Sequence, residues 1–321
     1  MAIGVVFATS KLSLAATQTP APAANSATVG QGLEISPPLV EIKGDPGQTL
    51  TLSIRLRNVT GSTVVTQAAV NDFTAKDELG DPQIILDPNE TSSYSLRTWV
   101  TNVQSLTLAS KEAKTATAII SIPKNAEPGG HYGVIRFTAL PPGISQTGVA
   151  LSASIGELVL LDVSGNTHEH LSFADFYIAK NGTKHSFFES GPFDLVERVK
   201  NDGNLHEKPT GAVDIFNTFG HKIASLKIND PPHNILPASI RRFDQSWRKS
   251  WLVGRYRARA TLSYGPDQTQ LVQSIVFWVI PWRLILIVLA ALIVITLLLR
   301  FTIKSYNARI IRRAQGRNQR R

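Results

Sequence analysis

The segment Thr49–Arg57 reads TLTLSIRLR, and its polar and apolar residues alternate with a period of two. Successive side chains of a β-strand point to opposite faces, so this pattern predicts a strand with one buried and one exposed face. The same alternation recurs over residues 115–122, 131–140 and 149–163. Clusters of Pro, Gly, Asn and Asp separate these segments, at residues 44–47, 80–82, 87–89 and 127–130. Short strands divided by such turns predict an antiparallel β-sandwich.

A second set of strand patterns follows the small polar residues Gly165, Asn166 and Thr167. Its members cover residues 171–179, 193–199, 212–217, 222–228, 255–264 and 271–279. No helical periodicity of ten residues precedes the C-terminal apolar segment. The sequence therefore predicts an all-β body of two tandem immunoglobulin-like sandwiches, over residues 33–165 and 166–280, followed by one transmembrane α-helix.

The segment Leu284–Leu299 (LILIVLAALIVITLLL) carries no charged residue. As a helix it would be about 24 Å long, a little short of the roughly 30 Å apolar core of a membrane. Trp282 and Arg283 precede the segment and Arg300 follows it, as interfacial anchors do. A buried core helix would need polar residues along one face, and this segment has none. We therefore expect a transmembrane helix over residues 281–303, anchored by Trp282, Arg283 and Arg300.

Positive charge is concentrated at the C-terminus of the chain. Eight Lys and Arg residues, and no acidic residue, follow Leu299. Short segments rich in Lys and Arg stay in the cytoplasm, so we expect a cytoplasmic tail over residues 304–321 and an extracellular body. Of the 33 Lys and Arg residues, 25 remain outside the tail, against 24 Asp and Glu. This balance does not imply a nucleic-acid-binding surface, and the predicted partner of the tail is the anionic inner leaflet.

The N-terminus combines a weak apolar segment with a polar spacer. Residues 1–8 read MAIGVVFA, and Ser13-Leu14-Ala15 has the small-x-small form of a signal-peptidase site. We expect a signal peptide over residues 1–16 whose true start lies upstream of Met1; a disordered leader is the alternative. Residues 17–32 are rich in Ala, Pro, Thr, Ser and Gly, which predicts a disordered spacer. The chain has no cysteine, so its core alone must hold the body together.

The sequence offers little that would support catalysis. It contains no phosphate-binding GxxxxGK[ST] and no GxGxxG motif. His168-Glu169-His170 lacks a third metal ligand nearby, and the acidic residues around Gly80 fit an exposed hairpin tip better than a calcium loop. The glycines of residues 143–148 are spaced too far apart for a nucleophile elbow. We predict no enzyme, no cofactor and no metal; a carbohydrate-active enzyme stays an alternative, because sequence does not reveal a carboxylate pair in a cleft.

Each domain contains its own set of turn and edge motifs, although the two domains show no strict sequence repeat. In the first domain they are residues 36–42 (SPPLVEI), 46–49, 56–58, 70–74, 80–82 and 122–123, and then residues 129–135 (GGHYGVI). In the second domain they are residues 201–206 (NDGNLH), Pro209, Gly211, 236–237 and 254–256. These motifs, and the order of the parts, resemble the WxL-interacting proteins of Gram-positive bacteria. A Pro/Ala spacer stands here where that family usually has a Gln-bearing extended segment.

The resemblance implies a first domain associated with peptidoglycan and a second associated with host or partner proteins. We therefore interpret the chain as a single-pass protein of the cell membrane and cell surface that serves adhesion or scaffolding. Its partner would be a cell-wall polymer or a surface protein. The alternative is a non-catalytic sensory or assembly subunit of a membrane complex. Periplasmic pilus chaperones share the sandwich class, but the membrane span argues against that assignment.

Gly129, Gly130 and Tyr132 are the candidate partner-binding residues. They begin an apolar strand pattern directly after a turn, at a position where an open sheet edge could accept a strand from a partner. An ordinary internal turn is the alternative interpretation.

Overall fold

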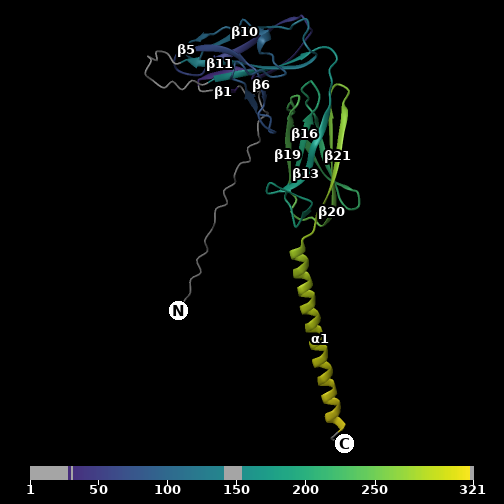
Figure 1. Ribbon diagram of the computed structural model, residues 1–321. Coiled ribbons are helices and arrows are strands. Elements are labelled where there is room, and N and C mark those ends of the chain that lie inside the picture. The colour runs from purple at the N-terminus through teal and green to yellow at the C-terminus, as the bar shows by residue number, and fades with distance from the viewer. Residues whose placement is uncertain (1–27, 30–31, 141–153, 319–321) are drawn as a thin grey trace, which may run out of the picture.

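The computed structural model describes residues 28–29, 32–140 and 154–318, with side chains over residues 32–140 and 154–307. The expected signal peptide, most of the spacer and the segment 143–148 lie outside these residues. The described chain consists mostly of β-strands and ends in one apolar helix, which confirms the all-β prediction with a single helix (Figure 1).

The first sandwich consists of two facing five-stranded sheets. One sheet has the order β1 (Thr28–Val29), β2 (Leu33–Ser36), β4 (Thr49–Asn58), β10 (Ala113–Ser121) and β8 (Val100–Thr101). The other has the order β3 (Leu39–Gly44), β12 (Ser154–Val163), β11 (Gly129–Leu140), β5 (Val64–Asn71) and β9 (Thr107–Leu108). The predicted alternation is observed in β4, where Leu52, Ile54 and Leu56 are buried in the core between the sheets.

Each sandwich departs from the predicted antiparallel pairing at one strand. Strand β3 pairs in parallel with β12. The extended segment that contains β2 and β3 is interrupted at Pro37 and Pro38, so that β2 joins one sheet and β3 the other. Because the chain keeps its direction while it changes sheets, β3 runs parallel to its new neighbour. In the second sandwich β15 (Phe187–Phe188) pairs in parallel with β21 (Thr269–Val279) in the same way.

A small hairpin covers part of the outer face of the first sandwich. Strands β6 (Phe73–Ala75) and β7 (Pro82–Ile84) form it, and a 3-10 turn, η1 (Arg97–Trp99), follows. The hairpin agrees with the expected polar tip around Gly80, but Asp72 at its base is fully buried. Its Oδ1 accepts hydrogen bonds from Ser95 Oγ (2.8 Å) and from the backbone N–H of Arg97 (3.1 Å). This carboxylate therefore fixes the hairpin to the sandwich.

The second sandwich pairs a four-stranded with a five-stranded sheet. The first has the order β14 (Thr183–His185), β13 (Leu171–Lys180), β16 (Phe193–Asn201) and β19 (Ile240–Trp247). The second has the order β15, β21, β20 (Gly254–Tyr264), β17 (Thr210–Phe216) and β18 (Lys222–Ile228). Aromatic rings fill the core between them; the ring centroid of Phe193 lies 4.9 Å from Phe188 and 5.7 Å from Phe277.

Helix α1 (Trp282–Asn318) begins two residues after β21 ends. Its segment Trp282–Asn307 is long and apolar enough to cross a membrane, and none of its most apolar part is buried against the rest of the chain. At 1.5 Å per residue these 26 residues measure about 39 Å, which exceeds the roughly 30 Å apolar core of a bilayer. The helix extends beyond the predicted span, into the basic tail.

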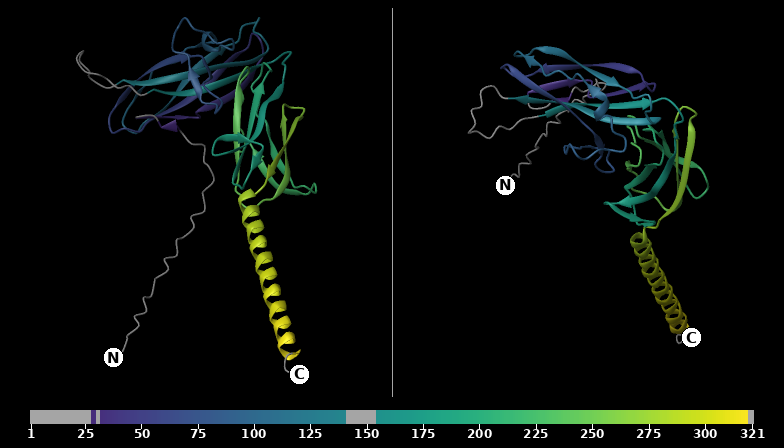
Figure 2. Two further views of the ribbon diagram at one scale, coloured as in Figure 1. Left: turned by 60° about the horizontal axis from the view of Figure 1, so that its bottom comes forward. Right: turned by 45° about the horizontal axis from the view of Figure 1, so that its top comes forward.

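The first sandwich lies across the end of the second that is remote from α1, as all the views agree (Figures 1 and 2). The chain passes from β12 to β13 through residues 164–170, which contain the predicted linker Gly165-Asn166-Thr167. The predicted domain limits, as units that fold independently, stay a prediction.

Candidate functional site

The motif at residues 129–132 forms the joint between the sandwiches. The backbone N–H of Gly130 donates to the carbonyl of Asn204 (2.8 Å), and Asn204 Nδ2 donates to the carbonyl of Pro128 (2.9 Å). The phenol of Tyr132 lies over Gly130, where a Cβ would clash with its oxygen. From there the hydroxyl reaches Nδ1 of His206 at 3.3 Å. Burial raises the pKa of Tyr132 and lowers that of His206, so both groups are neutral at neutral pH.

The open sheet edge assumed for Gly129, Gly130 and Tyr132 is therefore closed. All three residues are buried in β11, which pairs with β12 on one side. On the other side the N–H groups of Gly130 and Tyr132 already donate to the carbonyls of Asn204 and Tyr94. Strand addition would have to break these bonds. A partner-binding role for the three residues stays a prediction, while the contacts assign them to the joint.

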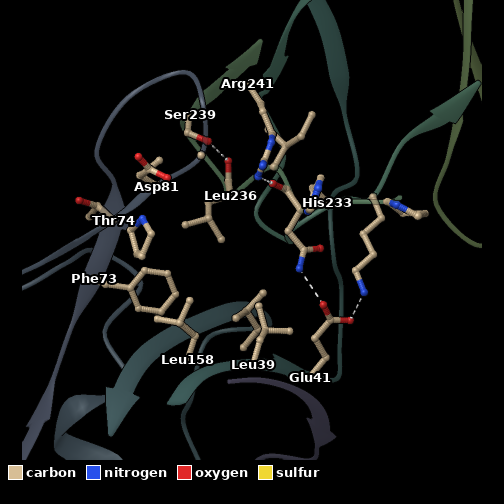
Figure 3. A pocket seen from close by; sticks show the side chains of 18 of the residues that line it. Leu39, Glu41, Phe73, Thr74, Asp81, Leu158, His233, Leu236, Ser239 and Arg241 are labelled. Carbon is tan, nitrogen blue, oxygen red and sulfur yellow. Dashed lines mark hydrogen bonds and ion pairs between the residues drawn. The ribbon is translucent and has the colours of Figure 1, made fainter. Parts of the chain in front are cut away.

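A pocket of about 300 Å³ opens beside this joint (Figure 3). Three parts of the chain supply its walls: the outer face of β3 and β12, the β6–β7 hairpin, and the segment of residues 232–241 from the second sandwich. Its floor is apolar and contains Leu39, Phe73, Leu158, Leu160 and Leu236. Leu236 packs from the second sandwich against the buried cluster around Phe73 and Tyr132. The floor thus continues the apolar contact between the domains.

The rim of the pocket carries an ion pair between the sandwiches. Glu41 of β3 accepts hydrogen bonds from Lys208 Nζ (2.5 Å) and from Asn234 Nδ2 (2.7 Å). Burial alone would raise the pKa of Glu41, but these two donors outweigh it, and the pKa is lowered. Glu41 is therefore held as a carboxylate, which makes it a poor general acid.

Arg241 and Asn234 leave hydrogen-bonding capacity free in the pocket. Arg241 donates from Nη1 to the carbonyl of Asn234 (2.7 Å), and this is its one hydrogen bond to a described residue. Burial lowers its pKa slightly from a very high value, so the guanidinium stays charged. Oδ1 of Asn234 is buried and has no hydrogen-bond partner among the described residues. The pocket therefore offers spare donors and one acceptor above an apolar floor.

The hairpin ties the far wall of the pocket to the second sandwich. Arg198 donates to both carboxylate oxygens of Glu78, with Nε to Oε2 at 2.8 Å. The backbone N–H of Arg242 donates to the carbonyl of Glu78 at 2.6 Å. Gly80 at the hairpin tip packs directly on the guanidinium of Arg241, and there is no room for a Cβ. Glu78, one of the acidic residues of the tip, thus serves the contact between the domains.

Three further carboxyl groups are buried away from the pocket. Glu157 is 0 % exposed, lies on the core-facing side of β12, and neither of its oxygens has a partner among the described residues. Burial raises its pKa to about 7. Burial, with the nearby Glu169 and Asp162, also raises the pKa of Glu207 to about 7. Glu197 has the equivalent core-facing position in β16, and burial followed by the charge of Asp244 raises its pKa well above normal.

The two histidines of residues 168–170 and the predicted membrane anchors do not line the pocket. His168 and His170 do lie on one face, with their rings stacked at 5.9 Å. Among the described residues, no group of three metal-ligating side chains is placed to hold an ion. Trp282 and Arg283 begin α1, and the Arg283 guanidinium lies over the Trp282 ring at 5.4 Å. Arg300 lies farther along the same helix, at the end of the uncharged segment.

The pocket itself was missed by the sequence analysis. Phe73 and Leu236 belong to motifs that were noted, at residues 70–74 and 236–237, but nothing linked them. Leu39 and Glu41 belong to the motif at residues 36–42, but nothing marked them as pocket residues. Lys208 and Arg241 were not noted at all, because single charged residues in strand and loop segments carry no signal of their own. The available clue was in β19, where the adjacent Arg241 and Arg242 directly precede the alternating residues Phe243, Gln245 and Trp247.

No protein-family model matches the chain, and no curated protein is similar to it in sequence. Among solved structures, a chaperone–tip adhesin complex of CFA/I fimbriae biogenesis has 12% identity and a TM-score of 0.40, covering 75% of this chain and 97% of its own. The class 5 fimbriae chaperone CfaA has the same identity and TM-score, covering 75% and 98%. A complex of Salmonella enterica SafA pilin with the SafB chaperone has 11% identity and a TM-score of 0.36, covering 78% and 100%. Values this low support no inference about activity or partners.

Proposed function

We propose that the chain is a single-pass, non-catalytic surface protein that binds another protein in the pocket between its two sandwiches. The observation that carries this proposal is the composition of the pocket. Its apolar floor suits a buried side chain, and the spare donors of Arg241 and the acceptor of Asn234 suit the backbone amide beside it. We infer that the sandwiches are immunoglobulin-like and that the chain is a WxL-interacting protein.

The topology of the proposal follows from the charge of the tail. Eight positive residues after Leu299 hold that end in the cytoplasm and against the anionic inner leaflet, so the pocket faces the extracellular side. The pocket chemistry favours a protein over a cell-wall polymer, because its floor is built of leucines and a single phenylalanine rather than of several aromatic rings. The ionised Glu41 supports binding over acid catalysis.

One observation favours a second candidate, a sensory or assembly subunit. The connection between β21 and α1 is short and hydrogen-bonded. The N–H of Ile280 donates to the carbonyl of Phe188 (2.7 Å), and that of Trp282 to the carbonyl of Ile280 (2.8 Å). A tilt of the second sandwich would therefore be passed directly to the helix.

Chemical crosslinking in intact cells, followed by purification of the full chain, tests the proposal. Leu39→Gln changes the pocket floor, and Val65→Gln is the matched control, because the two side chains are 39% and 43% exposed. We expect one surface protein to be captured with the wild type and Val65→Gln, and at least fivefold less with Leu39→Gln. Equal capture by all three, or co-sedimentation of the purified chain with isolated peptidoglycan that Leu39→Gln leaves unchanged, would contradict the pocket as the site.

A further inference from the structure

The end of the second sandwich next to α1 exposes large aromatic side chains from three separate segments. Phe187 of β15 is 68% exposed, Phe219 in the β17–β18 turn is 83% exposed, and Trp251 in the segment before β20 is 79% exposed. Most large aromatic residues of this sandwich are instead buried in its core. Aromatic residues this exposed, on three neighbouring loops, indicate a surface that contacts something apolar.

Strand pairing places all three segments at the level where the helix begins. Phe187 pairs with Trp278, and Gly254, which follows the Trp251 segment, pairs with Val279. Thr218 Oγ1 beside Phe219 accepts from the N–H of Arg255 (3.1 Å), and Arg255 pairs with Trp278. Three residues lie between Trp278 and Trp282, so the two are at most about 14 Å apart along an extended chain. The three segments therefore lie at the end of the second sandwich from which α1 starts (Figures 1 and 2).

A pocket of about 420 Å³ lies at this same end, between the β17–β18 turn and β20. Arg255, Arg257 and Arg259 line it together with Phe219, and no acidic residue is among its described lining residues. None of the three guanidinium groups forms an ion pair with a described residue. Arg255 lies nearest to the helix, with Arg257 and Arg259 two and four residues farther along β20. Arg248 and Lys249, both exposed, add two more charges beside Trp251.

We propose that this end of the second sandwich docks on the outer surface of the bilayer, with the arginine pocket binding the phosphate of an anionic phospholipid headgroup. The planar guanidinium group of arginine can donate two hydrogen bonds to phosphate oxygens, and aromatic side chains are enriched in the interfacial layer of a membrane. The apolar segment of α1 starts two residues from Trp282, which fixes the headgroup layer at the height of these loops. Lipid headgroups therefore already lie beside this surface.

Docking at this surface gives the second sandwich a defined orientation. The short connection between β21 and α1 couples the tilt of the second sandwich to that of α1, and three aromatic contacts with the bilayer would limit this tilt. The joint between the sandwiches then lies at the end of the second sandwich that is remote from α1 (Figure 1). This inference rests on the membrane span and orientation of the proposed function, but the aromatic residues and arginines that carry it are separate from the pocket between the sandwiches, so either site can fail alone.

Site-directed spin labelling of the full chain in lipid nanodiscs tests the inference. The chain has no cysteine, so Ser250→Cys beside Trp251 and Ser53→Cys on the first sandwich give single labels. Collisions with oxygen, which enriches in lipid, and with a water-soluble nickel chelate report the depth of each label. The discs contain phosphatidylcholine alone or with one-third phosphatidylglycerol. Arg255→Gln/Arg257→Gln removes two charges of the pocket, and Arg55→Gln/Lys124→Gln removes two exposed charges elsewhere.

We expect the Ser250 label to be shielded from nickel in anionic discs, and the Ser53 label to stay in water in both. Each basic residue near an anionic surface changes the binding constant about fivefold, so Arg255→Gln/Arg257→Gln should weaken the docked population about 25-fold. Arg55→Gln/Lys124→Gln should behave as the wild type. The inference would be overturned if the Ser250 label were as accessible to nickel as the Ser53 label. It would also be overturned if Arg255→Gln/Arg257→Gln left that accessibility unchanged. Binding of inorganic phosphate to a chain whose Ser250 label is equally accessible to nickel in both kinds of disc would also overturn it, because the pocket would then bind the free ion and not the headgroup.

Discussion

Tyr132 joins two sandwiches because the residue two positions before it has no side chain. Its phenol occupies the space over Gly130, and from there it contacts His206 across the joint. The rings of Phe73 and Tyr94 pack against it at 6.2 and 6.0 Å. A single tyrosine therefore links the hairpin, the sheet and the second domain.

Gly130→Ala tests this arrangement. The added methyl group would displace the Tyr132 hydroxyl and break its bond to His206, so we expect a loss of about 1–3 kcal/mol in the free energy of unfolding. Urea titration of the full chain in detergent, followed by tryptophan fluorescence, measures it. Gly61→Ala is the control, because nothing lies within 4 Å of a Cβ there. Equal stability of the two variants would contradict the role given to Gly130.

Glu157 should make the free energy of unfolding depend on pH. Its pKa is raised to about 7 in the folded chain, above the unfolded value of 4.5, so the folded state binds the additional proton between these values. Its contribution to stability is therefore present at pH 4.5 and is lost as pH rises through 7. Glu157→Met should stabilise the chain by about 1–3 kcal/mol at pH 8 and by little at pH 5.

Urea titrations at the two pH values measure this difference, and Glu90→Gln on an exposed loop is the control. His206 acts in the opposite direction, because its lowered pKa makes stability fall as pH decreases below 6.5. The comparison between variants separates the two effects. If Glu157→Met and Glu90→Gln respond alike to pH, Glu157 is not buried as an unpaired acid.

At the level of elements, the β6–β7 hairpin fixes the angle between the domains. Its tip holds the second sandwich through the Glu78 carboxylate and through the Glu78 carbonyl. Spin labels at Ser53→Cys and Ser274→Cys, one on each sandwich, report their separation. Glu78→Gln should broaden the measured distance distribution, because a neutral amide cannot form the ion pair with the Arg198 guanidinium. Asp175→Asn, which loses the ion pair with Lys184 inside the second sandwich, should leave it unchanged.

Strands whose core face is mainly apolar were predictable, and one strand whose faces both carry charged residues was not. Residues 49–57 were predicted within one residue of β4, because one face of this strand is uniformly polar. Residues 222–228 were predicted with the bounds of β18, although both of its faces are mixed. Strand β19 was missed, because Arg241, Arg242 and Asp244 conceal its apolar alternation. In β16 and β12 a buried glutamate interrupts the core face, but flanking Val and Leu residues preserve the pattern.

The site was beyond prediction for a different reason. Leu39, Phe73 and Leu236 meet only because two sandwiches dock at one particular angle. Local periodicity predicts which face of a strand is buried, but it carries no information about the partner that buries it. The glycines of residues 129–130 were recognised as unusual. Their position in the joint between the sandwiches, and not at an open sheet edge, depends on Asn204 and His206, more than 70 residues away.

At the scale of the whole molecule, the basic tail should determine the topology. We expect a membrane-impermeant maleimide to label Ser53→Cys on intact cells, and to label Ser305→Cys only after permeabilisation. The reason is the cluster of positive charges after Leu299, which resists translocation. Labelling of Ser305→Cys on intact cells would place the tail outside and reverse the orientation of the body.

The most direct test of the central claim, that the pocket between the sandwiches binds a protein, is photo-crosslinking from within it. A benzophenone amino acid replaces Leu39 in the pocket or, as control, Val272 on the outer face of β21. After illumination of intact cells that express the full chain, we predict one discrete adduct from position 39, weakened by Arg241→Gln, and none from position 272. The same adduct from both positions, or none from position 39, would contradict the account.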